Sequence, residues 1–196
     1  MIKAETLKTA IYENDIAFLK SNIGAYNINA RFEDEDNDTL LLFAIGISQN
    51  ETYKFFLQNG ADVYATNALT ENILHSIVYS GDFDRLNYIM KQGYNINLDE
   101  KTIDGATPLL ISIALGKSDI AKALINMGAD VNIPDNEGLT PLHIACQEGD
   151  IELVKLLIEK GANIRTKTAK GNYPIMLAIS NDNEELSRIL FEQHFS

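Results

Sequence analysis

His143 and Cys146 are the residues whose types and spacing come nearest to a catalytic pair. Three positions apart on a helix, they share one face, and a histidine beside a cysteine can activate the thiol as a nucleophile. The sequence pattern supplies no third residue that would orient the imidazole. Similar segments of the chain carry branched apolar residues in place of the cysteine, namely Ile45, Val78, Ile113 and Ile179. The pattern therefore favours a buried, apolar thiol over a nucleophile.

The acidic run Glu33–Asp38 is the second candidate for chemistry, because carboxylates at alternate positions open a calcium-binding loop. Three residues have that spacing: Asp34, Asp36 and Asp38. However, Thr39 stands where the calcium loop needs a glycine, and Ile45 stands where it needs a bidentate glutamate. We expect a solvated charge cluster on a loop tip, with a cation site as the alternative.

The rest of the chain has no glycine-rich phosphate loop, zinc-type Cys/His cluster or Ser-His-Asp set, so the sequence predicts no enzyme, cofactor or metal. A net charge of −12 argues against nucleic acid or an anionic membrane as partner, since both attract basic surfaces. No apolar run approaches the ~20 residues that span a bilayer. The single cysteine and the lack of an apolar leader predict a cytoplasmic protein.

A period of 33 residues organises the sequence. Thr107-Pro108-Leu109 recurs as Thr140-Pro141-Leu142 and, altered, as Tyr173-Pro174-Ile175, and the same spacing separates Gly105, Gly138 and Gly171. Two extra residues fall in the loop between Asn97 and Gly105, where an insertion costs little. The period divides a single domain, 1–196, into six repeats: a diverged N-terminal cap at about 1–33, then 34–66, 67–101, 102–134, 135–167 and a C-terminal cap at 168–196.

Each repeat reads as two short helices. In the fifth, Thr140 can cap the first helix and Pro141 suits its first turn. Asp150 can cap the second helix, which Gly161 ends in a left-handed conformation. Such a pair cannot bury both its apolar faces, so neighbouring repeats must stack. Polar residues in the last helix predict a cap with a hydrated outer face: Glu184, Glu185, Ser187 and Arg188.

The fifth repeat, "DNEGLTPLHIACQEGDIELVKLLIEKGANI", resembles the ankyrin-repeat signature almost position by position, and the likeness is strong over residues 67–180. The resemblance implies an all-α ankyrin-repeat solenoid of about six stacked helix-turn-helix units with projecting loop tips. It also implies that His75 and His143 tie neighbouring loops together by hydrogen bonds. Ankyrin-repeat proteins hold other proteins on a concave face formed by the loop tips and first helices.

Stacking in register brings the tip residues and the last turns of the first helices onto that face. The protein-binding residues predicted in this way are Glu35, Asp36, Asp38, Ile47, Leu69, Glu71, Tyr79, Ser80, Ile103, Asp104, Leu115, Asn136, Glu137, Leu139, Gln147 and Glu148. The tip of the sixth repeat adds Lys170 and Asn172. An apolar strip rimmed by carboxylates is typical of a protein contact, although some of the apolar residues could instead tuck against adjacent loops.

The predicted function is a non-catalytic scaffold or adaptor for a protein with an apolar stripe and basic flanks. The alternative is a self-association or structural module that pairs through the same apolar strip. The chain itself is expected to be a monomer or a weak homo-oligomer.

Overall fold

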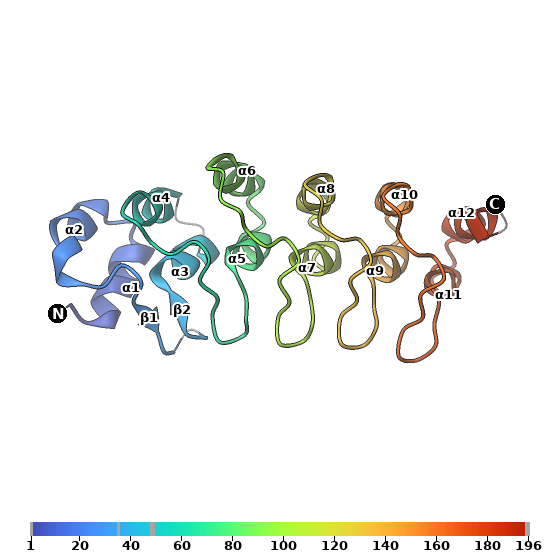
Figure 1. The fold of residues 1–196 in the computed structure, drawn as a ribbon, viewed down its shortest axis with the longest axis horizontal. Coiled ribbons are helices and arrows are strands. Elements are labelled where there is room, and N and C mark those ends of the chain that lie inside the picture. The colour runs from blue at the N-terminus through green and yellow to red at the C-terminus, as the bar shows by residue number, and fades with distance from the viewer. Residues whose placement is uncertain (1, 35, 48–49, 195–196) are drawn as a thin grey trace. The chain divides into compact units, whose positions relative to one another are not determined.

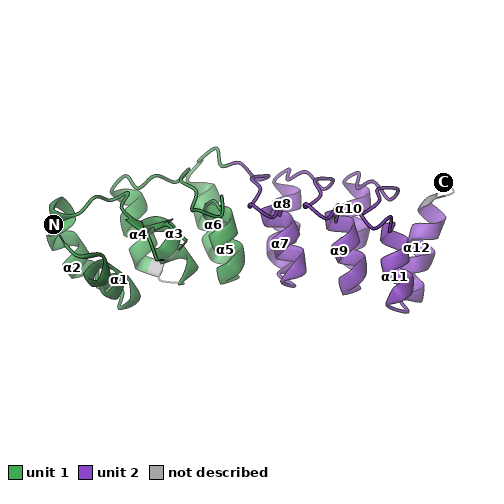
Figure 2. Ribbon diagram, turned by 90° about the horizontal axis from the view of Figure 1, so that it is seen from below, with its two compact units in different colours: residues 1–96 green, residues 97–196 purple. Residues whose placement is uncertain are grey.

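The computed structural model describes residues 2–34, 36–47 and 50–194 of the chain. These residues divide into an N-terminal unit, Met1–Ile96, and a C-terminal unit, Asn97–Ser196, each compact in itself (Figure 2). The division falls at the loop that carries the two-residue insertion. The single-domain organisation expected from the sequence stays a prediction.

The N-terminal unit contains three helix pairs and one short β-hairpin. Its elements in chain order are α1 (Ala4–Tyr12), α2 (Ile16–Ser21), a 3-10 turn (Ile23–Ala25), β1 (Arg31–Phe32), β2 (Asp38–Thr39), α3 (Leu40–Gly46), α4 (Asn50–Gln58), α5 (Ile73–Ser80) and α6 (Phe83–Lys91). Helices α3 and α5 pack together, as do α2 and α4. Tyr12 of α1 meets the ring of Phe43 on α3 edge-on, with 5.4 Å between the ring centroids.

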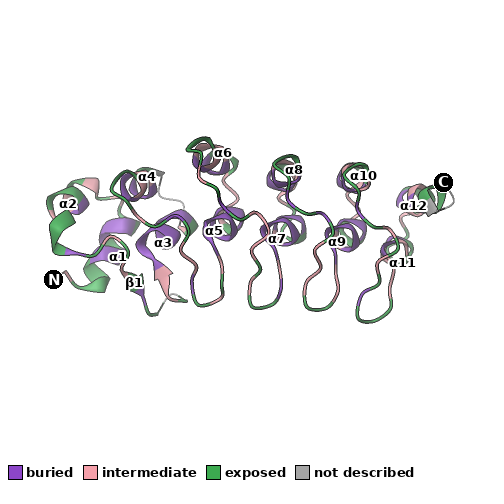
Figure 3. Cartoon of the chain, viewed as in Figure 1, coloured by how far each residue is buried: buried purple, intermediate pink, exposed green. Residues whose placement is uncertain are grey.

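The C-terminal unit repeats one helix pair three times. Its helices are α7 (Pro108–Ala114), α8 (Ser118–Asn126), α9 (Pro141–Glu148), α10 (Ile151–Glu159), α11 (Pro174–Ser180) and α12 (Glu184–His194). First helices α7, α9 and α11 form one row beside the loop tips, and second helices α8, α10 and α12 form the row behind them (Figure 1). Buried residues line the space between the two rows (Figure 3). The all-α repeat fold predicted from the sequence is confirmed.

The helices begin and end where the sequence places their caps. The Thr140 hydroxyl accepts the backbone N–H of His143, and Pro141 occupies the first turn of α9. Asp150 accepts the N–H of Leu153 at the start of α10, 2.9 Å away. Gly161 follows α10 with φ of +88°, a left-handed conformation that glycine adopts without strain. These four predictions are confirmed.

The loop tips of the last four repeats share one hydrogen-bonded turn. We define the tips as residues 67–71, 102–106, 135–139 and 168–172. In each, the first residue donates its N–H to the carbonyl of the fifth, as Asp135 does to Leu139 at 3.0 Å. In the C-terminal unit adjacent tips are also joined, since Ala169 donates its N–H to the Glu137 carbonyl at 2.8 Å. The tips of the C-terminal unit therefore have a fixed spacing.

The second repeat differs, because its tip is the β1–β2 hairpin rather than the shared turn. The acidic run lies on this hairpin, and its residue Glu35 is outside the described residues. Asp34 pairs with Lys8 of α1 at 2.6 Å, and the hydrogen bond from that ammonium group lowers the pKa of the Asp34 carboxyl. One carboxylate of the run thus joins the hairpin to α1.

The outer face of the sixth repeat is less polar than predicted. Glu184, Glu185 and Arg188 are exposed on α12, as expected for a hydrated cap, and Ser187 is half-buried. On α11, however, Met176 is 43% exposed and Ile179 is 57% exposed. Ile179 stands at the position of Cys146, which is fully buried in the fifth repeat. Ile179 is exposed because no later repeat covers α11 within the described residues.

Candidate protein-binding surface

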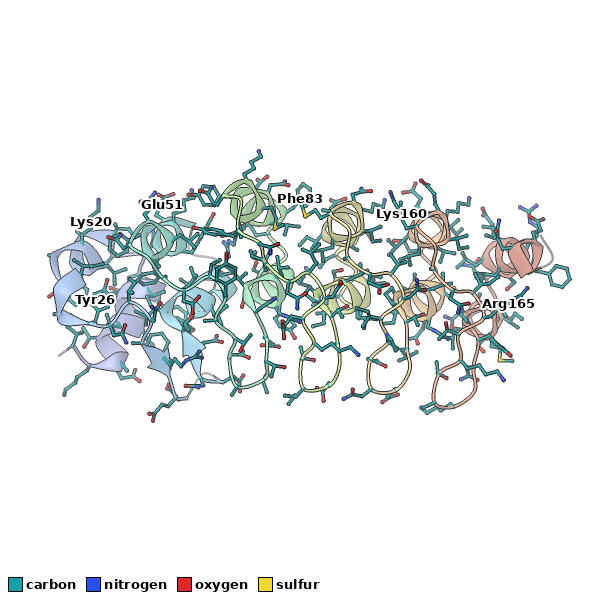
Figure 4. The ribbon with its side chains drawn as sticks, viewed as in Figure 1. Lys20, Tyr26, Glu51, Phe83, Lys160 and Arg165 are labelled. Carbon is teal, nitrogen blue, oxygen red and sulfur yellow. The ribbon has the colours of Figure 1, made fainter. Side chains whose placement is uncertain are left out.

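The predicted binding residues are distributed over both compact units. Asp36, Asp38, Ile47, Leu69, Glu71, Tyr79 and Ser80 belong to the N-terminal unit, whereas Ile103, Asp104, Leu115, Asn136, Glu137, Leu139, Gln147 and Glu148 belong to the C-terminal unit. Figure 4 shows the side chains that project from the helices and loop tips of each unit. Each group of residues is described within its own unit.

In the C-terminal unit, five predicted residues line an open hollow of about 350 Å³ between the fifth and sixth repeats: Glu137, Leu139, Gln147, Lys170 and Asn172. Glu137 and Leu139 reach it from the tip of the fifth repeat, and Gln147 reaches it from α9. The sixth repeat supplies the other wall, with Thr168, Ala169, Lys170, Asn172 and Leu177. The hollow therefore has apolar walls with a carboxylate on one tip and an ammonium group on the next.

The sequence prediction missed Thr168, Ala169 and Leu177 as lining residues. Leu177 lies one period after Ile144, which itself lies one period after Ile111, and all three side chains are half-buried. An apolar residue that recurs at this position without becoming fully buried marks the surface of the first helices. That recurrence is the signal in the sequence that could have identified Leu177.

The apolar residues of the predicted strip fall into two groups. Ile103 is 57% exposed, and Leu115 and Tyr79 are each 48% exposed, so these three present apolar surface to solvent. Leu69 and Leu139 are only half-exposed. These two leucines therefore present less apolar surface to solvent than the first three residues do.

In the N-terminal unit, the predicted carboxylates take part in a side-chain network. The Tyr79 hydroxyl donates to Glu71 at 2.7 Å. The Asn67 side-chain amide donates both to Glu71, at 2.8 Å, and to Asp38, at 3.0 Å. Hydrogen bonds to a carboxylate are stronger than those between neutral groups, so the network holds Tyr79 against the third loop tip. The tyrosine is thus fixed at the surface in one orientation.

The remaining predicted residues of the N-terminal unit lie at turns and helix ends. Asp36 is exposed in the hairpin turn with φ of +47°, and its carbonyl accepts the N–H of Ala68 at 2.7 Å. Ile47 follows α3 and is half-buried. The Ser80 hydroxyl donates to the Ile77 carbonyl at 2.8 Å. Asp36 and Ser80 therefore make intramolecular bonds in the free protein.

His143 has the structural role that the resemblance implied. Its Nδ1 accepts the backbone N–H of Thr140 at 3.2 Å, so in the neutral ring Nε2 carries the proton and donates to the Asn172 carbonyl, 3.1 Å away. The ring thereby ties the fifth repeat to the tip of the sixth. Burial lowers the pKa of His143 by disfavouring the charged imidazolium. In the third repeat, His75 completes the cap of α5 by accepting the N–H of Asn72 at 3.0 Å.

Cys146 is fully buried, and burial raises the pKa of its thiol to about 12. A thiol with this pKa holds its proton at neutral pH, so it is not present as the nucleophilic thiolate. In this pair, His143 links the fifth repeat to the sixth by a hydrogen bond and Cys146 packs in the core. Their arrangement supports structure rather than covalent chemistry. Among the residues that the structure describes, no group of three or more His, Cys, Asp or Glu side chains could hold a metal ion.

The neutral state of His143 predicts how stability changes with pH. Its pKa is lowered in the folded chain, so below about pH 6.5 the unfolded chain takes up a proton that the folded chain does not. Stability should then fall as the pH decreases from about 7 to about 5.5, by at most about 1.4 kcal/mol per pH unit from this group. Urea denaturation at both pH values measures the change.

His143→Leu is the matched variant for this test, because the fourth repeat carries buried Leu110 at the same position. The variant should lose stability at pH 7 through its missing hydrogen bonds but should show a smaller loss on acidification than the original chain. An equal loss in both proteins would show that His143 does not titrate in this way.

Residues 74–168 match the family model described as ankyrin repeats in three copies. M-phase phosphoprotein 8 of Homo sapiens is 32% identical over 68 residues, which are 35% of this chain and 8% of that protein. The neurogenic locus notch homolog protein 1 of Homo sapiens is 30% identical over 103 residues, 53% of this chain and 4% of that protein. An ankyrin repeat protein of fowlpox virus is 32% identical over 113 residues, 57% of this chain and 33% of that protein.

The chain thus spans at most about a third of the length of these relatives. Over the described ranges, each helix is too short or too polar to cross a bilayer. The capped helix pairs and the shared tip turn recur among the residues that the family model matches. The chain thus contains ankyrin repeats, which the family model matches over residues 74–168.

Proposed function

We propose that this chain is a non-catalytic protein-binding scaffold that holds its partner on the surface formed by the loop tips and first helices. Ankyrin repeats are generally protein–protein interaction modules. The observation that supports this surface most directly is the hollow between the fifth and sixth repeats. It combines half-exposed apolar walls, from Leu139 and Leu177, with the charged groups of Glu137 and Lys170 at adjacent tips.

The hollow suits an apolar side chain of the partner. Leu139 and Leu177 offer it apolar contacts, and displacing water from such surface is favourable by about 25 cal/mol per Å². The tips are held by backbone hydrogen bonds, so little ordering is needed when the partner binds. Most of the affinity would then come from one small apolar side chain of the partner that fits between the two walls.

Charge in the C-terminal unit favours a partner with basic groups beside that anchor. Asp104, Glu137 and Glu148 are all exposed at the predicted surface. Lys170 is the counterpart of Glu137 one period later, so the charge changes sign at the sixth tip. Basic flanks of the partner would be attracted along the tips of the fourth and fifth repeats, which raises the association rate more than the affinity.

The proposed location of the complex is the cytoplasm.

A charge-introducing variant tests the proposed surface. Leu115→Lys combined with Leu139→Lys places two ammonium groups among the apolar residues, so partner retention should fall at least about tenfold. Partners are captured from native lysate on the immobilised chain and quantified by mass spectrometry. Met127→Lys is the matched control, because Met127 is a 37% exposed apolar residue at the end of α8, away from the tips.

Retention of the same proteins by the double variant and by the original chain would contradict the proposed surface, provided that circular dichroism shows both to be folded. The alternative function, pairing of two copies through the same strip, predicts a different result. In that case the double variant would lower the mass of the purified chain in solution, without any partner present.

A further inference from the structure

The charge of the loop tips changes sign across the hollow between the fifth and sixth repeats. In the fifth repeat, carboxylates stand at the tip and at the end of α9, whereas the positions one period later hold neutral or basic residues. The pairs of equivalent positions are Asp135 and Thr168, Glu137 and Lys170, and Glu148 and Asn181. Residues 160–181 contain four basic residues and no acidic one. In a chain with a net charge of −12, the sixth repeat therefore presents a basic tip beside an acidic tip.

Glu137 and Lys170 are the two charged residues that line the hollow, and both are exposed. Among the described residues, neither the Glu137 carboxylate nor the Lys170 ammonium group forms a hydrogen bond or an ion pair. Their backbones are held close together, because the Glu137 carbonyl accepts the N–H of Ala169 at 2.8 Å. Lys167 differs, since its ammonium group lies over the ring of Tyr173, 5.0 Å from the centroid. The hollow thus has one unpaired negative and one unpaired positive group on adjacent tips.

Apolar side chains line the same hollow, namely those of Leu139 and Leu177. When an apolar residue of a partner enters, the charged groups beside it come close to Glu137 or Lys170 and lose part of their water. Partly buried charges are screened by salt less than exposed ones. Opposite charges across a contact favour binding, and like charges suppress it. The hollow can therefore distinguish the sign of the charge on each side of an apolar residue.

We propose that the hollow binds a protein segment with ordered charges: a basic residue, an apolar anchor and an acidic residue. The basic residue faces Glu137 on the fifth tip, the anchor enters the hollow, and the acidic residue faces Lys170 on the sixth tip. This inference rests on the proposed function and refines it, because the basic groups of the partner then lie on one side of the anchor only. A segment with basic residues on both sides would bring one of them against Lys170, which is unfavourable.

A nucleic acid strand fits the two tips less well than such a segment. Phosphates that approach Lys170 would continue onto the fifth repeat, where Glu137 and Glu148 are exposed. A strand carries negative charge along its whole length, so the attraction at one tip is opposed by repulsion at the next. The change of sign between adjacent tips favours a ligand whose own charge changes sign over a short distance.

Selection of random short peptides displayed on phage against the immobilised full chain tests the charge order. The enriched peptides should share an apolar residue with a basic residue on one side and an acidic residue on the other, in either chain direction. Synthetic copies should bind Lys170→Glu at least about tenfold more weakly than the original chain, because an attraction becomes a repulsion. Replacing the acidic residue of the peptide with lysine should restore binding to this variant. Fluorescence anisotropy measures each dissociation constant.

Lys160→Glu is the matched control, because it makes the same change of charge at an exposed lysine that follows α10, in the row of second helices (Figure 4). It should leave the affinity for the peptides within about twofold, since charges far from the contact are screened by salt. Leu115→Lys combined with Leu139→Lys tests the surface itself and should remove the binding of the same peptides.

The charge order and the proposed function can fail separately. Peptides that lose affinity for the double leucine variant but bind Lys170→Glu as well as the original chain would overturn the charge order alone. Peptides that bind the double leucine variant unchanged, or the enrichment of no peptide at all, would count against the surface and the charge order together. Equal weakening by Lys160→Glu and Lys170→Glu would also overturn the inference, because net charge rather than position would then decide binding.

Discussion

Replacing Arg85 with alanine is expected to lower the free energy of unfolding by about 3 kcal/mol, because the arginine is an almost fully buried cation that bridges three helices. Its guanidinium group donates to the Ile45 carbonyl near the end of α3 and pairs with Asp82 at 3.0 Å. It also lies over the ring of Tyr53 on α4, 5.0 Å from the centroid. Alanine would remove all these contacts and leave a cavity. Urea denaturation followed by circular dichroism measures the loss.

Arg85→Met separates the charge from the volume. The equivalent positions in α8, α10 and α12 are the buried residues Ile120, Leu153 and Leu186, so this place in the fold accepts an apolar side chain. A well-packed apolar residue often replaces a buried ion pair at little cost, so the loss for methionine should be below about 1 kcal/mol. Equal losses for alanine and methionine would mean that the polar contacts, rather than the filled volume, stabilise α6.

Replacing Gly138 with alanine is expected to cost about 2–3 kcal/mol, from two separate causes. The residue has φ of +81°, where a side chain is strained by about 1 kcal/mol or more. An added Cβ would also lie 3.0 Å from the backbone nitrogen of Ala169 and 3.1 Å from the Cα of Thr168. The fifth and sixth tips would have to separate, which weakens the hydrogen bond from Ala169 to the Glu137 carbonyl.

Gly171→Ala is the matched control, because Gly171 has the same place in the sixth tip and φ of +82°, but its added Cβ would have nothing within 4 Å. It should show the backbone strain alone, about 1 kcal/mol. The difference between the two variants, measured by chemical denaturation, is the contribution of the contact between tips. Equal losses of unfolding free energy for the two variants would show that the fifth and sixth tips can separate without loss of stability.

The sequence was sufficient for the repeat, the helix pairs and their caps, because these depend on local chemistry that recurs every 33 residues. Thr140, Pro141, Asp150 and Gly161 each act through neighbours within a few positions. Thr70 shows the limit of such reasoning. It takes the place of the tip glycines with φ of +62°, and the shared turn forms although a β-branched residue occupies it.

The surface could be predicted only in part, since exposure depends on contacts between repeats. Periodicity identified Glu137, Leu139 and Gln147 on one wall of the hollow and Lys170 and Asn172 on the other. It did not identify Thr168, Ala169 and Leu177. It also could not show that Glu71 is bonded to both Tyr79 and Asn67, because those contacts depend on side-chain orientation. Ile179 is exposed although its counterpart Cys146 is buried, because no later helix covers α11 within the described residues.

The buried thiol of the fifth repeat has a practical consequence. Cys146 is the chain's one cysteine, and its surroundings keep it both covered and protonated. A thiol reagent can reach it only while the helix pair around it is transiently open. The labelling rate of the unmodified protein therefore reports how often the fifth repeat opens locally. A bound protein that stabilises α9 would lower this rate.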